Sequence, residues 1–254
     1  MLKIENVSFA YAQKPVLNNI SMNVGKGEFV AILGANGAGK STLVKIASGF
    51  IKPQGDVKLN DKSIFKMSAR ELALSRAVLE QETNLEFNYT VLDTVSLGRF
   101  AMSGFFGIDS RSKDIAQLAL EKVGLKGFET KQYLELSGGE RRRVQLARVL
   151  AQILDAPQGK LLLLDEPTAN LDPKHSYQVM QICKEMCNLG ASCIAVVHSV
   201  EHAMNFAHKT AMISNNTLFQ FGDTSQILIP ENISALYGMQ CEIVGNTRKT
   251  VVLY

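Results

Sequence analysis

The chain has 254 residues, of which 46% are hydrophobic and 20% are charged, a composition that suits a globular protein with a sizeable core. Its formal net charge of +3, from 27 basic and 24 acidic residues, is too mild to indicate a nucleic-acid partner. No apolar run approaches the roughly 20 residues of a membrane-spanning helix, and the first residues lack the features of a signal peptide. We therefore expect a cytoplasmic chain that reaches a membrane only through a partner.

The first part of the chain predicts strands followed by a glycine-rich loop. Residues 1–11 and 16–24 alternate between apolar and polar side chains, as half-buried strands do. FVAIL, at residues 29–33, is a continuous apolar run, which suits a buried central strand. This strand leads into the loop GANGAGKST at residues 34–42, and a helix is predicted over residues 40–49, where a glycine ends it.

The next segment predicts a strand, a helix and a second buried strand. A turn-bounded strand is predicted over residues 53–61. Ser68 and Glu71 form a possible capping box for a helix over residues 69–75. The strand at residues 76–81 follows directly.

Helices are predicted throughout residues 83–153, where apolar residues recur at helical spacing and glycines separate the runs. After this insertion strands alternate with helices again, which favours a parallel α/β sheet. The chain is predicted to end, over residues 235–254, with a helix end and a small hairpin. Later strands are expected over residues 160–167, 192–199, 209–214 and 217–222, helices over residues 173–190 and 200–207, and a turn at residues 215–216.

The four cysteines show no CxxC spacing and have no histidine at metal-ligand distance in the sequence. We interpret them as buried, inert thiols in a reducing compartment. They are Cys183, Cys187, Cys193 and Cys241.

The loop at residues 34–42 fits the phosphate-binding pattern GxxxxGK[ST] through Gly34, Gly39, Lys40 and Ser41. In this pattern the glycines let backbone N–H groups surround phosphates, and the lysine reaches the β and γ oxygens. Ser41 would then bind Mg²⁺. A strand before the loop and a helix after it are the context that the pattern requires, which favours this interpretation over a purely structural loop.

Four polar side chains close predicted strands. Asp165 and Glu166 follow the apolar run at residues 161–164, and beside a phosphate loop they suit a role at Mg²⁺ and a role in polarising the attacking water. His198 ends another apolar strand and could hydrogen-bond the γ-phosphate, with a structural histidine as the alternative. Gln81 could contact Mg²⁺ or the water, or it could be a surface glutamine.

LSGGERRRVQLAR, at residues 136–148, could begin a helix whose free N–H groups attract an anion. It would be a second phosphate cradle in a chain that already has one. We interpret Arg141, Arg142 and Arg143 as a solvated helix face whose aliphatic stems pack nearby, with direct phosphate contact as the alternative.

Taken in order, GANGAGKST, Gln81, LSGGE, LLLLDEP, NLD and His198 resemble the ATP-binding subunit of ABC transporters over essentially the whole chain. LSGGE separates this family from kinases and GTPases that share only the phosphate loop. The resemblance implies an α/β fold: a RecA-like P-loop NTPase core with a parallel sheet, an N-terminal antiparallel β subdomain and a helical insertion. It implies one domain, residues 1–254, with a core of residues 1–82 and 154–230, a helical subdomain of residues 83–153 that carries the signature, and a C-terminal extension of residues 231–254.

The resemblance also implies partners and residue roles. Two copies of the chain would sandwich two ATP molecules with Mg²⁺, each ATP held by the Walker A loop of one copy and the signature of the other. Closure would drive a membrane permease dimer, served by a periplasmic or surface binding protein, and hydrolysis would reset it. The implied ATP-binding residues are Tyr11, which stacks on adenine, Gly34, Asn36, Gly37, Gly39, Lys40, Ser41 and Thr42, with Ser137, Gly138, Gly139 and Asp172 acting on the partner's ATP. The implied catalytic residues are Glu166, His198 and Gln81, and the implied Mg²⁺ ligands are Ser41, Gln81 and Asp165.

Two positions depart from the family pattern. Ser199 follows the switch histidine where aspartate is usual, which leaves the local partner of His198 open. The D-loop reads ANLD instead of SALD, but Asp172 is retained. Neither departure removes a group that hydrolysis needs.

Three segments resemble the ATPases of importers for iron siderophores, hemin and cobalamin: residues 87–99, residues 236–244 and, closest to the hemin importers, residues 153–160. We therefore expect an ATPase on the inner face of the cell membrane that energises hemin import, with siderophore or cobalamin import as alternatives. A non-transport ABC ATPase acting on nucleic acid or ribosomes usually carries a long coiled-coil insertion or tandem nucleotide domains, and this chain has neither. A monomeric small-molecule kinase would leave LSGGE without a role. We expect no nucleic-acid partner.

Overall fold

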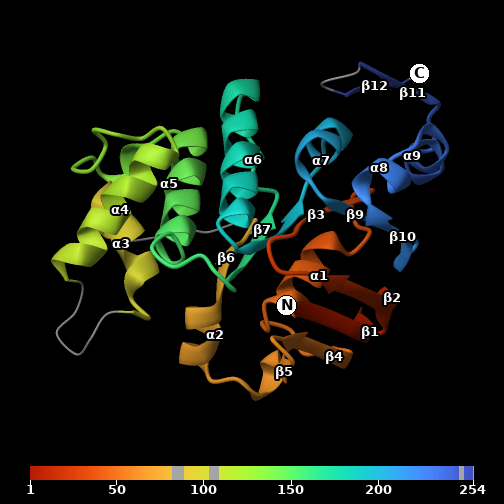
Figure 1. Ribbon diagram of the computed structural model, residues 1–254, viewed down its shortest axis with the longest axis horizontal. Helices are drawn as coiled ribbons and strands as arrows, with labels where there is room; N and C mark the ends of the chain where they lie inside the picture. The colour runs from red at the N-terminus through yellow and green to blue at the C-terminus, as the bar shows by residue number, and fades with distance from the viewer. Residues whose placement is uncertain (82–88, 103–108, 246–248, 254) are drawn as a thin grey trace.

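A six-stranded sheet forms the centre of the computed structural model, which describes residues 1–81, 89–102, 109–245 and 249–253 (Figure 1). Neighbouring strands are parallel except for the last pair, β9 with β10. This confirms the predicted parallel α/β core. The strand order is β10 (Thr217–Asp223), β9 (Lys209–Ser214), β3 (Phe29–Gly34), β8 (Ser192–Val196), β7 (Leu161–Asp165) and β6 (Arg76–Leu79).

Both faces of this sheet are buried, which explains why its strands are continuous apolar runs. In β3, Phe29, Ala31 and Leu33 belong to one hydrophobic core. Val30 and Ile32, which alternate with them, belong to the other. The first core is shared with the helices α5 (Gly138–Ala151), α6 (Pro173–Asn188) and α7 (Val200–Phe206).

The second core lies between the central sheet, α1 (Lys40–Ala47) and a four-stranded sheet. That sheet is antiparallel throughout, as predicted for the N-terminal part of the chain. Because only residues 35–39 separate β3 from α1, this packing holds the start of the helix near the end of the central strand. The strand order is β2 (Lys14–Val24), β1 (Leu2–Tyr11), β4 (Gln54–Leu59) and β5 (Lys62–Ser63).

A layer of helices lies at one end of the molecule, to the left in Figure 1, and confirms the predicted helical insertion. Its N-terminal boundary, predicted at residue 83, falls outside the described residues. The elements are α3 (Val91–Ser96), the 3₁₀ turn η2 (Leu97–Arg99), α4 (Ser110–Lys122), the 3₁₀ turn η3 (Tyr133–Glu135) and α5.

The predicted capping box opens α2 (Ala69–Ser75), which follows the 3₁₀ turn η1 (Ile64–Lys66). The Glu71 N–H donates to Ser68 Oγ over 3.2 Å, and the Ser68 N–H donates to Glu71 Oε2 over 2.7 Å. Several elements end two or three residues earlier than predicted. Among them, α1 ends at Ala47, before a left-handed Gly49, β6 at Leu79 instead of residue 81, and β8 at Val196 instead of residue 199.

The C-terminal part contains α8 (Thr224–Ile227), α9 (Pro230–Tyr237) and the predicted hairpin of β11 (Cys241–Val244) and β12 (Thr250–Leu253). The predicted turn before β10 is formed by Asn215 and Asn216, with φ of 48° and 64°. All four cysteines are buried free thiols, as predicted: Cys183, Cys187, Cys193 and Cys241.

Gly98 allows the helical layer to pack closely. A Cβ at this position would lie 2.0 Å from the Arg148 carbonyl oxygen of α5. We expect Gly98→Ala to lower the free energy of unfolding by about 1–3 kcal/mol, because the two segments must separate, and urea denaturation would measure it. Gly138→Ala is the control, since a Cβ there meets nothing within 4 Å. Equal stability of the two variants would contradict this packing.

Candidate active site

The glycine-rich loop connects β3 to α1 and closes around its own lysine. Lys40 Nζ donates to the carbonyl oxygens of Gly34 and Ala35, each over 2.9 Å. Gly37 and Gly39 have φ of 79° and 96°, a backbone region that favours glycine. Because the lysine already bonds carbonyls of the loop, its ammonium is held over the position where phosphates bind in this motif.

A cavity of about 370 Å³ opens beside the loop. Its lining joins the phosphate loop to three strand-end side chains that are far away in the sequence. The structure therefore brings together most of the predicted nucleotide-binding and hydrolysis residues. The lining residues are Val16, Asn36, Gly37, Gly39, Lys40, Ser41, Thr42, Gln81, Glu166 and His198.

Asp165, the last residue of β7, lies next to the start of α1. Ser41 Oγ donates to Asp165 Oδ1 over 3.1 Å, and Asp165 as a residue is 2% exposed. The pKa of Asp165 is raised, mainly by burial and also by the neighbouring Glu166, although the Ser41 hydrogen bond acts to lower it. The pKa of Lys40 is lowered because burial outweighs the opposite effect of the Glu166 and Asp165 carboxylates.

The residues around Asp165 fit a magnesium ion. Hydroxyl and carboxylate oxygens are ligands that Mg²⁺ prefers, and the ion is commonly bound by one or two carboxylates together with substrate phosphates. No group of three or more His, Cys, Asp or Glu side chains that could hold a metal occurs among the described residues. An ion at Ser41 and Asp165 would therefore take further oxygens from phosphates.

Glu166 lies between the other two predicted hydrolysis residues. His198 Nε2 and Glu166 Oε1 are 2.8 Å apart, and Gln81 Nε2 donates to Glu166 Oε2 over 3.3 Å. Glu166 has φ of 50°, a left-handed conformation that is rare for a glutamate and typical of strained functional positions. Ser199 Oγ caps α7 by accepting from the His202 N–H over 3.1 Å, so Glu166 is the partner that the structure gives His198.

The predicted signature residues do not line this cavity. Ser137 caps α5 in a capping box, in which Glu140 Oε2 accepts from the Ser137 N–H over 2.8 Å. A Cβ on Gly138 would meet nothing within 4 Å, whereas one on Gly139 would lie 3.4 Å from the Asn170 carbonyl oxygen. Packing within the chain therefore does not require glycine at position 138.

Four further predicted residues also lie outside the lining: Gly34 and Asp165, described above, and Tyr11 and Asp172. Tyr11 is 48% exposed and packs edge-to-face on Phe9, with ring centroids 4.9 Å apart. Asp172 caps α6 by accepting from the His175 N–H over 2.9 Å, and its other oxygen lies 2.6 Å from His175 Nδ1. These hydrogen bonds from His175 lower the pKa of Asp172.

The arginines that follow the signature do not form a solvated face, so the interpretation favoured from the sequence is wrong. All three side chains donate to backbone carbonyls. Arg141 bonds Leu134, Arg143 bonds the end of α4, and Arg142 reaches the ends of β6 and β7. The sequence shows the basic run but contains no signal for these acceptors, which lie up to 62 residues away.

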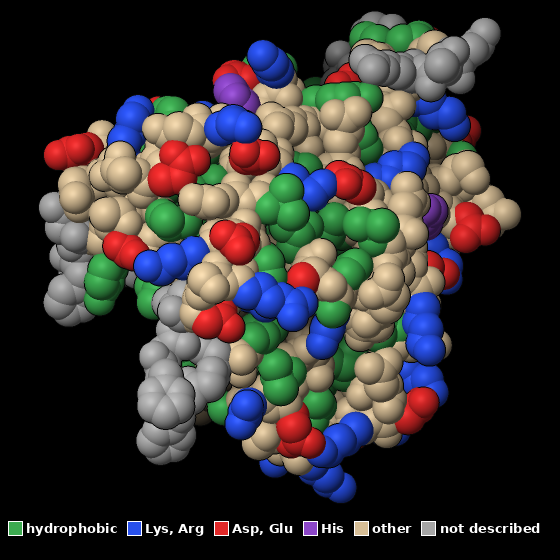
Figure 2. Space-filling model, turned by 60° about the vertical axis from the view of Figure 1, so that its left-hand side comes forward, with side chains coloured by type: hydrophobic (Ala, Val, Ile, Leu, Met, Phe, Trp, Pro, Cys, Tyr) green, Lys and Arg blue, Asp and Glu red, His purple; other side chains and the backbone are tan. Residues whose placement is uncertain are grey.

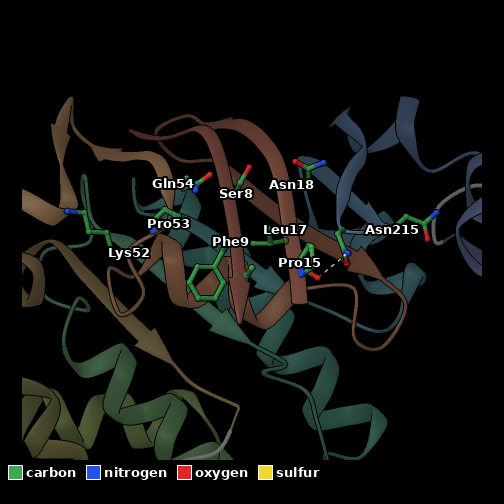
Figure 3. Close-up of a pocket in the computed structure, with 11 residues that line it drawn as sticks. Ser8, Phe9, Pro15, Leu17, Asn18, Lys52, Pro53, Gln54 and Asn215 are labelled. Carbon is green, nitrogen blue, oxygen red and sulfur yellow. Dashed lines mark hydrogen bonds between the residues drawn. The ribbon is translucent and has the colours of Figure 1, made fainter. Parts of the chain in front are cut away.

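A larger cavity, of about 720 Å³, lies by the β1–β2 hairpin (Figure 3). It shares no lining residue with the cavity at the phosphate loop. Lys52 is the ionisable side chain among the described residues that line it, so this cavity lacks groups for general acid–base chemistry. We place the chemistry at the smaller cavity.

Within the described ranges, no helix combines the length and apolar character needed to cross a membrane. Residues 17–169 match the ABC transporter family. A hemin import ATP-binding protein of Deinococcus radiodurans is 38% identical over 93% of the chain and 90% of the relative. One of Gloeobacter violaceus is 37% identical over 98% and 91%.

Solved structures of ABC transporter proteins also match this chain. An inward-facing metal-chelate type ABC transporter matches with a TM-score of 0.82 and 26% identity, over 100% of this chain and 97% of that one. A dimeric ATP-binding cassette in a post-hydrolysis state, bound to ADP and Pi, matches with a TM-score of 0.77 and 27% identity, over 88% and 99%. Both matches support the P-loop NTPase fold.

Proposed function

The chain belongs to the ABC transporter family, and from that premise we propose that it is the ATP-hydrolysing subunit of a hemin importer. One observation carries the ATPase assignment: the phosphate loop and the Gln81–Glu166–His198 cluster line one cavity, and Ser41 in that lining is hydrogen-bonded to Asp165. The hemin assignment is supported by the relatives named for hemin import and by the likeness to a metal-chelate type transporter.

The phosphate loop would hold the ATP. Its backbone N–H groups surround the phosphates, and Lys40 moves its bonds from the loop carbonyls to phosphate oxygens. Mg²⁺, when bound by Ser41, Asp165 and Gln81, neutralises charge that develops on the phosphates. The residues proposed to contact nucleotide in this copy are Tyr11, at the adenine, and Gly34, Asn36, Gly37, Gly39, Lys40, Ser41 and Thr42.

Glu166 would act as the general base. Its carboxylate lies at the edge of the cavity and can accept a proton from a water that attacks the γ-phosphate. His198 holds one oxygen of Glu166 and Gln81 the other, so both side chains orient the base. Both also line the cavity, where each can hydrogen-bond the phosphate or the water.

The signature would act on the ATP of a second copy. Ser137, Gly138, Gly139 and Asp172 lie outside the cavity of their own chain, and open space surrounds the Cβ position of Gly138. Dimeric relatives of known structure support this arrangement. In an isologous dimer each signature faces the partner's phosphate loop, so both ATP molecules require both chains.

We place the dimer on the cytoplasmic face of the membrane, beneath a permease dimer that a periplasmic or surface binding protein supplies. The proposed organisation is a single domain: residues 1–82 and 154–230 form the core, residues 83–153 the helical subdomain and residues 231–254 an extension. Figure 2 supports the expectation of no nucleic-acid partner, because Lys and Arg side chains are mixed with Asp and Glu over the face it shows.

Growth on defined iron sources tests the proposed cargo. A strain without this chain should lose growth on hemin as the sole iron source and keep growth on ferrous salts. The intact gene should restore growth, whereas Glu166→Gln should not, because transport depends on hydrolysis. Continued growth on hemin, together with loss of ferric siderophore or cobalamin uptake, would contradict hemin as the cargo and support the alternative importers.

A further inference from the structure

Arg142 joins the two strand ends that carry hydrolysis residues. Its Nη1 donates to the carbonyl oxygens of Glu80 over 2.7 Å and Gln81 over 3.0 Å. Its Nη2 donates to the carbonyl oxygens of Asp165 and Glu166, the latter over 2.8 Å. One guanidinium group therefore binds four backbone carbonyl oxygens at the edge of the active site, two at the end of each of two neighbouring strands.

These hydrogen bonds begin where the sheet ends. The parallel pairing of β6 with β7 extends to Leu79 opposite Leu164, so the following peptides have no partner in that ladder. The guanidinium group, a planar donor with several N–H groups, bridges them instead. The bridged segments carry the functional side chains of Gln81 and Glu166. Glu166 also has a left-handed backbone conformation, which needs support from its surroundings.

Arg142 belongs to α5, the helix that Ser137 caps. The same rigid element therefore carries the signature at its N-terminus and holds the backbone of the chain's own hydrolysis residues one turn later. Building on the proposed ATP-sandwich dimer, we propose that Arg142 is a positioning residue. It couples the binding of the partner's ATP by this signature to the geometry of Glu166 and Gln81 in the chain's own site.

Arg143 provides a matched comparison. It is the next residue of α5 and also donates to carbonyl oxygens, those of Val123 and Gly124, each over 3.2 Å. Its acceptors lie at the end of α4, away from the cavity. If both arginines served only to anchor α5, substitutions at the two positions would have similar effects on kcat.

The test compares Arg142→Lys and Arg142→Met with Arg143→Lys and Arg143→Met. A lysine keeps the charge but cannot bridge two peptides, so we expect Arg142→Lys to lower kcat by about 30- to 100-fold, since small misplacements of catalytic groups have effects of this size. The KM for ATP should stay within about twofold. Arg143→Lys should keep kcat within about threefold. Similar kcat values for the two lysine variants would overturn the proposal.

Two further measurements separate positioning from folding. In a Glu166→Gln background, Arg142→Met should still form an ATP-dependent dimer; loss of that dimer would mean that Arg142 only builds the signature helix, and would overturn the proposal. Millimolar guanidinium should raise kcat of Arg142→Ala but not of Arg143→Ala. The space left by removing the Arg142 side chain adjoins the active site, whereas the space left by removing Arg143 does not. The proposed function fails separately, if the unaltered chain does not hydrolyse ATP.

Discussion

Replacing Glu166 with glutamine is expected to slow ATP hydrolysis by about 100- to 10,000-fold, or about 3–5 kcal/mol in activation free energy, the usual range for loss of a general base. Glutamine keeps the size of the side chain and one oxygen that can accept the Gln81 hydrogen bond. It cannot take a proton from water at neutral pH. ATP binding should persist, because Glu166 makes no hydrogen bond to the phosphate loop among the described residues.

Phosphate release at saturating ATP measures the loss, and light scattering measures the mass of the ATP-bound species. With hydrolysis blocked, the variant should accumulate as a dimer in ATP and Mg²⁺. Glu185→Gln is the control, because that carboxylate pairs with Lys122 on the surface. Hydrolysis within about tenfold of the unaltered chain would refute Glu166 as the base.

The placement of Gln81, Asp165, Glu166 and His198 could be predicted because of sheet geometry. Each lies at or just after the end of an apolar strand, and the carboxyl ends of parallel strands meet at one edge of a sheet. The strand–loop–helix context located Lys40 in the same way. Local patterns were sufficient to place these residues, although not to fix the last residue of each strand.

The acceptors of Arg142 could not be predicted, because nothing in a basic run specifies which distant carbonyls lie beyond the end of the β6–β7 pairing. The basic run Arg141 to Arg143 indicated a face exposed to solvent. In the structure, backbone carbonyls beyond the last pair of the β6–β7 ladder accept from Arg142. The partner of His198 was open for a similar reason. Ser199 proved to be a helix cap, which leaves the histidine to Glu166.

The C-terminal hairpin was predicted as an element, but its docking was not. Asn205 of α7 exchanges two hydrogen bonds with the Lys249 backbone, and the Val251 N–H donates to Glu201 Oε1 over 3.2 Å. The hairpin therefore lies on the helix that follows His198. Such side-chain-to-backbone contacts between distant segments leave no periodic pattern in a sequence.

Gly138→Leu should reduce ATP hydrolysis by at least about 100-fold without destabilising the chain. Leucine favours a helix more than glycine does, and the space around the Cβ position is open within one chain. In the proposed dimer the same space faces the partner's phosphates, so leucine would block the contact between that signature and the ATP it faces. ATP affinity of the monomer should stay within about twofold, because Lys40 and its loop are untouched.

Mixing two inactive variants distinguishes a shared site from an internal one. Lys40→Ala removes the phosphate lysine and leaves the signature intact, whereas Gly138→Leu does the reverse. In an equal mixture, half of the randomly formed dimers contain both variants, and each of these has one site with an intact loop and an intact signature. Activity should therefore recover to about a quarter of the unaltered rate. No recovery would contradict the shared site, since two cradles acting on one ATP within one chain cannot complement each other.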